Sequence, residues 1–280
     1  MAVSIVTDSV ADLPPQVVEE LGITVIPLNV RFGTEVYRDG VDLTAEQFYD
    51  RLVHSKTLPV TSVPSPESFA EAYDKLAEGT DEILAIIVSS KLSGTYEVAL
   101  QSIGLMKRKC RVEVIDSQWA VMAEGFIVIT TAKAAQAGAS LDEVVDIARK
   151  TIPHVDFLAT FDTLEYLKRG GRIGAAQALL GSILKINPLI TLEDGVVEPA
   201  GRTRSRAKAI DHLYSFAMSF AHIEEMAVED ATTPDDAERL VERLSSKFPK
   251  ERIYRSKTTP AIGTHTGPGL LLVAILGDRD

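Results

Sequence analysis

The amino-acid sequence predicts an α/β protein of two domains: first a doubly wound, mostly parallel sheet, then an α/β domain with a mixed or antiparallel sheet. In the first half, short apolar runs alternate with helix-start signals, and this alternation of strands and helices is typical of parallel α/β folds. Beyond about residue 153, strand-like runs follow one another more closely. A chain of 280 residues is also long for a single domain. We therefore expect domains at residues 1–153 and 154–280.

Strands of the first domain are expected at residues 3–6, 83–88 and 112–115. Each run is too short for a helix and is rich in β-branched residues. Nearly continuous apolar runs of this kind are typical of parallel strands that are buried on both faces.

Helices are expected between these strands, because capping residues precede amphipathic segments there. The cap pairs are Thr44 with Gln47, Ser65 with Pro66, and Ser140 with Glu143. After Ser65, apolar residues recur at intervals of three and four, which places one stripe on one helix face. Residues 119–135 form the most apolar long stretch, but Glu124 and Lys133 interrupt it. We expect a buried helix there rather than a membrane span.

The second domain is expected to contain five strands and three helices. Its strands are predicted at residues 155–161, 188–192, 224–229, 252–256 and 271–276, and its helices at 164–184, 206–221 and 234–248. Thr233 is the expected cap of the last helix, with Pro234 in its first turn. The turn-like Glu193-Asp194-Gly195 favours a sheet that is at least partly antiparallel.

The composition is that of an acidic globular protein, with 45% hydrophobic and 25% charged residues and a net charge of -11. An acidic surface is repelled by phosphate backbones, so nucleic acid is not an expected partner. The single cysteine, Cys110, has no disulfide partner within the chain, and the first residues show neither a basic leader nor a long apolar run. We therefore expect a cytoplasmic protein.

Small polar residues follow all three expected strands of the first domain, at Thr7-Asp8-Ser9, at residues 89–95 and at Asp116-Ser117. Such residues are often only helix N-caps. However, the carboxyl ends of parallel strands meet at one edge of a sheet, which favours a polar site there. In residues 89–95, Gly94 lets backbone N–H groups approach an anion closely. A second hydroxyl-rich segment is expected to be a loop at residues 60–64.

A nucleophilic serine is the sharper alternative for these hydroxyls, but it needs a base and an orienting acid, which the sequence does not identify. His265 lies in residues 263–269, a stretch too rich in glycine for an expected helix. An isolated histidine more often has a structural role. However, the position of His265 in a glycine-rich loop favours a functional role. At neutral pH it could give an anion a hydrogen bond or a positive charge.

Neither a metal nor a cofactor is expected. No two of the five histidines have the spacing of an i, i+4 metal pair, and the sequence contains no P-loop or dinucleotide-binding motif. Basic residues gather in two places, at Lys168-Arg169 with Arg172 and at every second position from Arg202 to Lys208. Solvated surface charge explains such clusters most simply, and the alternative is a docking patch for an acidic or phosphate-carrying partner.

Together these segments resemble the DegV family, and the resemblance runs nearly end to end. The motifs that carry it are Thr7-Asp8-Ser9, Ile26-Pro27-Leu28, Asp39-Gly40, Thr61-Ser62, residues 89–96, Ile115-Asp116-Ser117, residues 167–173 and residues 265–269. Each motif is weak alone, and their number, order and spacing identify the family.

The resemblance implies a carrier that buries a long-chain fatty acid between its two domains, with hydroxyls holding the carboxylate. The positions that match this fatty-acid site are Thr61, Ser62, Ser93, Gly94, Thr95 and His265. In such a carrier no residue is catalytic, and the ligand is the fatty acid itself.

The resemblance also implies a partner, a separate ATP-dependent fatty acid kinase that forms an acyl phosphate for phospholipid synthesis. Arg172 and Arg204 match the arginines that dock this kinase, while Arg202 and Arg206 leave the register of the second one open. We expect a monomer that touches membrane surfaces at most transiently. Two alternatives stay open, a hydrolase that uses Ser93 and His265 and a regulatory protein that senses lipid.

Overall fold

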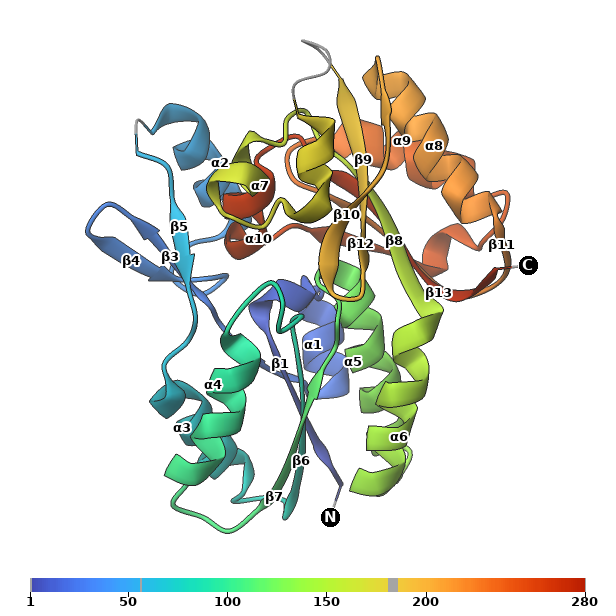
Figure 1. Cartoon of the computed structure of the whole chain (residues 1–280). Coiled ribbons are helices and arrows are strands. Elements are labelled where there is room, and N and C mark those ends of the chain that lie inside the picture. The colour runs from blue at the N-terminus through green and yellow to red at the C-terminus, as the bar shows by residue number, and fades with distance from the viewer. Residues whose placement is uncertain (1, 56, 181–185, 280) are drawn as a thin grey trace.

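The computed structural model describes residues 2–55, 57–180 and 186–279. Its lower part in Figure 1 is built on a four-stranded sheet of order β2-β1-β6-β7. The strands of this sheet are β1 (Ser4–Asp8), β2 (Thr24–Ile26), β6 (Glu82–Ile87) and β7 (Arg111–Asp116). Every neighbouring pair is parallel, which confirms the expected parallel sheet.

Helices cover both faces of this sheet, as a doubly wound layer requires (Figure 1). One face carries α3 (Pro66–Leu76) and α4 (Thr95–Ser102), and the other carries α1 (Pro15–Leu21), α5 (Val121–Gln136) and α6 (Leu141–Thr151). The side chain of Ser65 caps α3 by accepting from the N–H of Ser68. Helix α5 is buried over most of its surface, which confirms the buried helix expected at residues 119–135.

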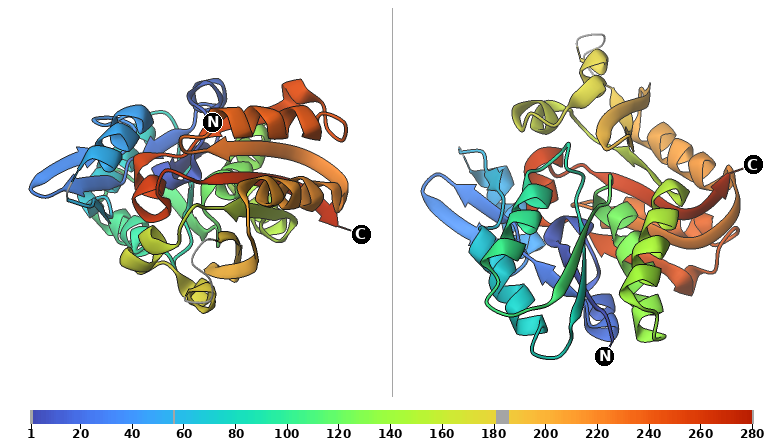
Figure 2. Two further views of the ribbon diagram at one scale, coloured as in Figure 1. Left: turned by 90° about the horizontal axis from the view of Figure 1, so that it is seen from above. Right: turned by 60° about the horizontal axis from the view of Figure 1, so that its bottom comes forward.

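A small antiparallel sheet stands beside the parallel one and projects from the side of the molecule (Figure 2). It consists of β3 (Asn29–Phe32), β4 (Glu35–Arg38) and β5 (Val60–Ser62), in the order β4-β3-β5, with α2 (Ala45–His54) between β4 and β5 in the chain. The loop expected at residues 60–64 is therefore wrong for residues 60–62. Thr61 pairs with Val30, and a partner about thirty positions away leaves no local signal.

The upper part of the molecule is a six-stranded mixed sheet of order β10-β9-β8-β13-β11-β12. Its strands are β8 (Val155–Thr160), β9 (Asn187–Glu193), β10 (Val196–Thr203), β11 (Phe220–Asp230), β12 (Ile253–Lys257) and β13 (Leu271–Arg279). Only the pairing of β11 with β12 is parallel, so the mixed sheet is confirmed. Asp194 and Gly195 close the β9–β10 hairpin, both with positive φ, as a tight hairpin turn demands.

The strand β13 shows how the six-stranded sheet is buried on both faces. Leu271, Val273 and Ile275 pack with α8 (Arg206–Met218) and α9 (Pro234–Leu244) in one core. The alternate residues Leu272 and Ala274 belong to the larger core that also holds α5 and the parallel sheet. Side chains alternate along a strand, so one apolar run serves both cores. The domain boundary near residue 153 stays a proposal, and β8 begins directly after it.

The helix expected over residues 164–184 is wrong in the described part of that range. Helix α7 (Glu165–Arg169) ends at Gly170-Gly171, and a 3-10 helix, Gly174–Leu179, follows. Gly171 and Gly174 have positive φ, a conformation that ends a right-handed helix. Residues 181–185 lie outside the described residues.

The loop expected at residues 263–269 is also wrong at its start, because α10 (Pro260–Thr266) is a helix. Pro260 stands in its first turn, and Gly267, with positive φ, follows its end. Gly263 lies so close to Phe48 and Tyr49 that a Cβ there would overlap them. Glycine in this helix thus serves close packing against α2. Thr233 occupies the expected cap position of α9, but its hydroxyl accepts from Arg206 instead of capping.

Candidate functional site

The polar residues after β1, β6 and β7 do meet at one edge of the parallel sheet, and some of them have structural partners. Asp8 accepts hydrogen bonds from the N–H groups of Val10 and Val88, at 2.8 and 2.9 Å. Asp116 accepts from Ser90, through the N–H at 3.2 Å and the hydroxyl at 2.5 Å. The two aspartates therefore hold the turn after β6 in place, and this turn carries Ser93.

An apolar pocket, called here the inner pocket, lies between the parallel sheet and the six-stranded sheet. Its free space is about 110 Å³. The parallel-sheet side contributes apolar residues of the short 3-10 helix η1 (Ser9–Ala11), of the turn after β6 and of the start of α5, which are Val10, Val88, Leu92, Ala120 and Val121. The opposite wall comes from β8, β9 and β13 with the loop before β13, and includes Phe157, Ile190, Leu192, Leu270 and Leu272.

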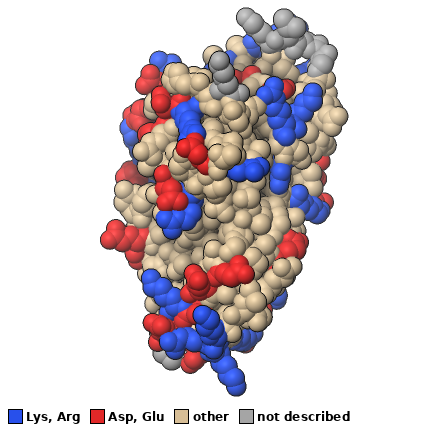
Figure 3. Space-filling view, turned by 90° about the vertical axis from the view of Figure 1, so that its left-hand side faces the viewer, with Lys and Arg blue, Asp and Glu red and all other residues tan. Residues whose placement is uncertain are grey.

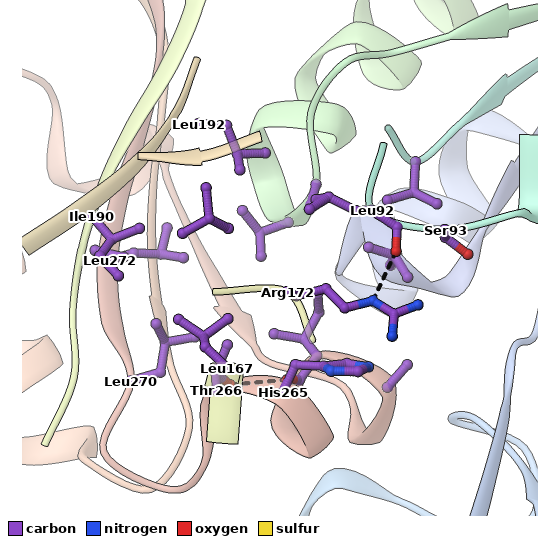
Figure 4. A pocket seen from close by; sticks show the side chains of 18 of the residues that line it. Leu92, Ser93, Leu167, Arg172, Ile190, Leu192, His265, Thr266, Leu270 and Leu272 are labelled. Carbon is purple, nitrogen blue, oxygen red and sulfur yellow. Dashed lines mark hydrogen bonds between the residues drawn. The ribbon is translucent and has the colours of Figure 1, made fainter. Parts of the chain in front are cut away.

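Most polar groups of the inner pocket lie toward one end, as the close view shows (Figure 4). The exception is Thr266, which lies beside Leu167 and donates its hydroxyl hydrogen to the Ile262 carbonyl at 3.0 Å. Ile190, Leu192, Leu270 and Leu272 gather on one side of this view, and Ser93, Arg172 and His265 lie on the other. Thr61 also lines the pocket. These four polar residues come from β5, the turn before α4, the segment after α7, and α10.

Hydrogen bonds hold each polar residue of this end in place. Thr61 Oγ1 lies 2.8 Å from His265 Nε2, and Ser93 Oγ lies 2.8 Å from Thr95 Oγ1. The guanidinium of Arg172 donates to the Leu92 carbonyl at 2.9 Å through Nε and to the Gly170 carbonyl at 2.6 Å through Nη1. The positive charge of Arg172 is thus fixed at the polar end of the pocket.

His265 is neutral at pH 7, because burial, with a further contribution from the charge of Arg172, lowers its pKa to about 4. Of the two roles expected for it, a hydrogen bond or a positive charge, the lowered pKa favours the hydrogen bond. Its Nδ1 is buried without a hydrogen-bond partner among the described residues. Orphaned N–H donors are rarer in proteins than orphaned acceptors, so we assign the proton to Nε2. In that tautomer His265 donates to Thr61, and the Thr61 hydroxyl hydrogen can point to a ligand.

The arrangement does not match a serine hydrolase. Ser93 is hydrogen-bonded to Thr95, and the hydroxyl beside His265 belongs to Thr61. The second nitrogen of His265 has no carboxylate beside it within the described residues. A nucleophile, its base and an orienting acid are therefore not aligned among the described residues.

Of the residues predicted for the fatty-acid site, Thr61, Ser93 and His265 line the inner pocket. Thr95 is fully buried behind Ser93. Ser62 and Gly94 are exposed and lie outside the pocket lining. Ser62 follows Thr61 in β5, and successive side chains of a strand point to opposite sides.

The predicted docking arginines differ in their surroundings. Arg204 is exposed, whereas Arg172 is half-buried and lines the pocket. Arg206 is tied to Asp236 at 3.0 Å and to the Gly269 carbonyl at 2.7 Å, which gives it a structural role. Sequence reasoning missed the pocket position of Arg172 and the apolar lining, which no local pattern distinguishes from ordinary core.

No group of three or more His, Cys, Asp or Glu side chains among the described residues is arranged to hold a metal ion. Among their helices, none has the length and apolar character needed to span a membrane.

Comparison with known proteins gives one family. The model of the family described as "Uncharacterised protein, DegV family" matches residues 2–278. The DegV domain-containing protein SCO2569 of Streptomyces coelicolor is 40% identical over 278 residues, which cover 98% of each chain.

Solved structures give the same result. The structure of DegV, a fatty acid binding protein from Bacillus subtilis, has a TM-score of 0.90 and 31% identity, and the match covers 99% of this chain and 100% of that one. A stearic acid-binding protein from Eubacterium ventriosum has a TM-score of 0.87 and 26% identity, with 98% of each chain covered.

Proposed function

The chain belongs to the DegV family, and from this premise we propose that it binds one long-chain fatty acid, with the acyl chain in the inner pocket and the carboxylate at its polar end. The observation that carries the proposal is the separation of apolar and polar side chains along the pocket. Its walls are apolar over most of their length, and its polar side chains other than Thr266 lie toward one end (Figure 4). A fatty acid is built in the same way, with an apolar chain and a polar carboxylate at one end.

The acyl chain supplies the affinity in this proposal. Burying one methylene group contributes about 0.8 kcal/mol, so a chain of about 16 carbons contributes on the order of 10 kcal/mol before ordering costs. The free space of about 110 Å³ is below the roughly 300–1,000 Å³ of usual ligand pockets. We propose that the walls of the inner pocket separate to admit the chain.

The carboxylate is the costly part, because a buried charge without partners costs several kcal/mol. We propose that Thr61 and Ser93 donate hydrogen bonds to it, and that His265 orients Thr61 by donating through Nε2. Arg172 supplies a positive charge at the same end of the pocket. Thr95 then supports Ser93 from behind, whereas Ser62 and Gly94 lie outside the pocket lining.

We extend the proposal to presentation of the bound carboxylate to a separate ATP-dependent kinase, which would form an acyl phosphate for phospholipid synthesis. The absence of a nucleotide-binding motif in the sequence supports a separate enzyme. Exposed Arg204 has the accessibility that docking requires. Half-buried Arg172 lines the inner pocket, and in this proposal it stands between the docked kinase and the bound carboxylate.

The setting of this function is part of the proposal. We propose a cytoplasmic monomer whose contact with membrane surfaces is at most transient. Cys110 is partly exposed and unpaired, which suits a reducing compartment. A hydrolase using Ser93 and His265 has less support, since the two side chains are not hydrogen-bonded to each other but to Thr95 and Thr61.

Native mass spectrometry of the protein purified from a bacterial host tests this function. We expect one bound long-chain fatty acid per chain, identified after denaturation. A preparation that is empty and does not take up added palmitate would rule out the carrier function. Turnover of acyl esters by the purified chain alone would instead support the hydrolase.

A further inference from the structure

Six carboxyl side chains are buried in the part of the chain that the structure describes, and no lysine or arginine is buried with them. They are Asp8, Asp12, Asp39, Glu124, Glu229 and Asp230. Charged side chains usually lie at the surface, as they do over the face shown in Figure 3. Among the buried six, only Asp230 forms an ion pair with a described residue, Lys257, at 3.1 Å. The other five carboxyls need another way to avoid an uncompensated buried charge.

Asp12 and Glu229 are two of these carboxyls, and they meet between the parallel sheet and the six-stranded sheet. Asp12 follows β1 and η1 on the parallel-sheet side, and Glu229 lies in β11 of the six-stranded sheet. The two carboxyl groups are within hydrogen-bonding contact of each other. They are called here the carboxyl pair.

Each member of the carboxyl pair also accepts an N–H from the opposite side. Asp12 accepts from Thr259, in the segment after β12, at 3.0 Å. Glu229 accepts from Met122 of α5, which covers the parallel sheet, at 3.1 Å. The pair therefore joins the two sides of the molecule through three contacts, one within the pair and one from each member.

The second oxygen of each carboxyl indicates that the pair holds a proton. Asp12 Oδ2 and Glu229 Oε1 are buried and have no donor among the described residues. Two ionised carboxylates only accept hydrogen bonds, whereas a protonated carboxyl also donates one. One proton shared by the pair would satisfy both oxygens at once and leave one buried charge instead of two.

The surroundings of the pair favour this proton. Burial raises the pKa of both carboxyls above their ordinary values, and the charge of Glu229 adds to the effect on Asp12. The titratable side chains that face the pair are Asp39 after β4, Tyr49 of α2, Glu124 of α5 and Asp230 of β11. None of these four is a cation, and Lys257 is paired with Asp230. A second negative charge on the pair would therefore meet only acidic or neutral groups in these elements.

The bonds of the carboxyl pair hold segments that line the inner pocket. Val10, Val121 and Ala261 belong to the pocket lining. Each lies within two positions of a residue in the bonds just described, in order Asp12, Met122 and Thr259. A change in the pair is thereby transmitted directly to three parts of the pocket wall.

Val121 shows that one of these segments is held under strain. Its φ is 55°, a left-handed conformation that is a true outlier for a β-branched residue. Such a conformation persists only where the surrounding structure imposes it. The hydrogen bond from the next residue, Met122, to Glu229 is one contact that imposes it. Loss of that bond would let this part of the pocket wall relax.

We propose that the carboxyl pair is a proton-dependent latch of the inner pocket. With a shared proton it holds the two sides together, and loss of that proton to water lets them separate and speeds release of a bound acyl chain. The proposal rests on the proposed fatty-acid binding, to which it adds a control of release. The closed form binds the proton more tightly than an open form in which water reaches the pair, so the latch opens as the pH rises.

Glu229→Gln tests the latch, because glutamine has the shape of a protonated glutamate, can donate to Asp12 and has no proton to lose. Release of palmitate is timed by stopped-flow fluorescence, with a fluorescent fatty acid in excess, between about pH 6 and about pH 9. We expect the release rate constant of the wild type to rise about tenfold over this range, and that of Glu229→Gln to stay within about twofold. Thermal unfolding checks that the variant is folded.

Glu124→Gln is the matched control. Glu124 is also fully buried, and burial likewise raises its pKa. However, it accepts from Thr7 of β1 at 3.3 Å, so this bond stays on the parallel-sheet side. Glu124→Gln should keep the pH dependence of release that the wild type shows. Loss of that dependence in Glu124→Gln as well as in Glu229→Gln would assign it to buried carboxyls in general and overturn the latch.

Hydrogen exchange of the Met122 amide tests the latch without a ligand. Its protection, relative to the intrinsic exchange rate at each pH, should fall with rising pH in the wild type and not in Glu229→Gln. If the two proteins show the same protection at every pH, the pair is not a latch. Falling protection without faster palmitate release would show that the pair does not control the pocket, which also overturns the proposal. A protein that binds no palmitate would fail the proposed function itself, and Met122 exchange alone would then support or overturn the latch.

Discussion

His265 Nε2 and Thr61 Oγ1 lie 2.8 Å apart, although 204 positions separate the two residues in the chain. The bond joins α10, near the end of the chain, to the short strand β5 of the small antiparallel sheet. It fixes the hydroxyl of Thr61 at the polar end of the inner pocket.

Thr61→Val should weaken palmitate binding about tenfold without unfolding the protein. Valine keeps the shape of threonine and removes the hydroxyl, and a hydrogen bond to a charged group contributes about 1.5–3 kcal/mol. Fluorescent fatty-acid displacement gives the affinity, and thermal unfolding checks the fold. Ser62→Ala is the control, since Ser62 is exposed and outside the pocket lining. Equal affinities of wild type and Thr61→Val would exclude Thr61 as a ligand of the carboxylate.

Gly170→Ala should weaken palmitate binding by displacing His265, because a Cβ on Gly170 would overlap His265 Nδ1. The control is Gly104→Ala, where a Cβ meets nothing within 4 Å. A double-mutant cycle with His265→Ala isolates the contact, since the effect of Gly170→Ala should largely disappear once the ring is absent. If Gly170→Ala weakens binding equally with and without the ring, the glycine does not act through His265.

Stability should fall as the pH rises from about 4 to 7. Burial raises the pKa of Asp39 to about 7 and that of Asp8 to about 6, whereas an unfolded aspartate titrates near 3.9. Between these values the folded state binds more protons than the unfolded state, so the free energy of unfolding decreases with rising pH. The contribution is fully present below about pH 4 and is lost above about pH 7.

Urea unfolding at several pH values between 5 and 7 measures this slope. Asp39→Asn should reduce it by up to about 1.4 kcal/mol per pH unit, the value for one proton. Asp42→Asn is the control, because the hydrogen bond from Arg38 lowers the pKa of exposed Asp42 to about 2. Asp42 is then ionised in both states over this range. A slope that Asp39→Asn leaves unchanged would show that Asp39 does not hold a proton in the folded protein.

Arg206→Ala should reduce stability, and Arg204→Ala should reduce only the coupling to a kinase. Arg206 connects α8 to Asp236 of α9 and to the Gly269 carbonyl before β13, so its removal should cost about 1–3 kcal/mol in the free energy of unfolding. Arg204 is exposed, and its removal should leave stability and palmitate binding unchanged but reduce phosphorylation of the bound fatty acid by a cognate kinase. A stability loss in Arg204→Ala comparable to that in Arg206→Ala would contradict this assignment.

Several parts of the fold were predictable from local pattern. Buried strands such as β6 and β13 are short, apolar and β-branched, and helices such as α3 carry their caps and apolar stripe within a dozen residues. The polar residues after β1, β6 and β7 also met at one sheet edge as expected. Hairpin chemistry at Asp194-Gly195 correctly indicated an antiparallel pair. In each case the information lies within one element or one turn.

The errors occurred where a distant segment decides the conformation. Residues 60–62 form a strand because they pair with the edge of β3. Residues 260–266 form a helix in which Gly263 packs against Tyr49. Neither partner is marked in the local sequence. Gly170-Gly171, in contrast, is a helix-ending signal within the local sequence, and the helix expected over 164–184 ignored it.

Local sequence therefore determined the class of the fold, its main strands and capped helices, and the hydroxyl-rich and basic segments from which the candidate site is drawn. Only the tertiary structure decided which of those residues share a pocket: Thr61, Ser93, Arg172 and His265 do, and Ser62 and Gly94 do not. The reason is physical. Propensity and capping depend on neighbours a few positions away, whereas a pocket is lined by side chains from many segments whose directions are fixed by sheet pairing and packing.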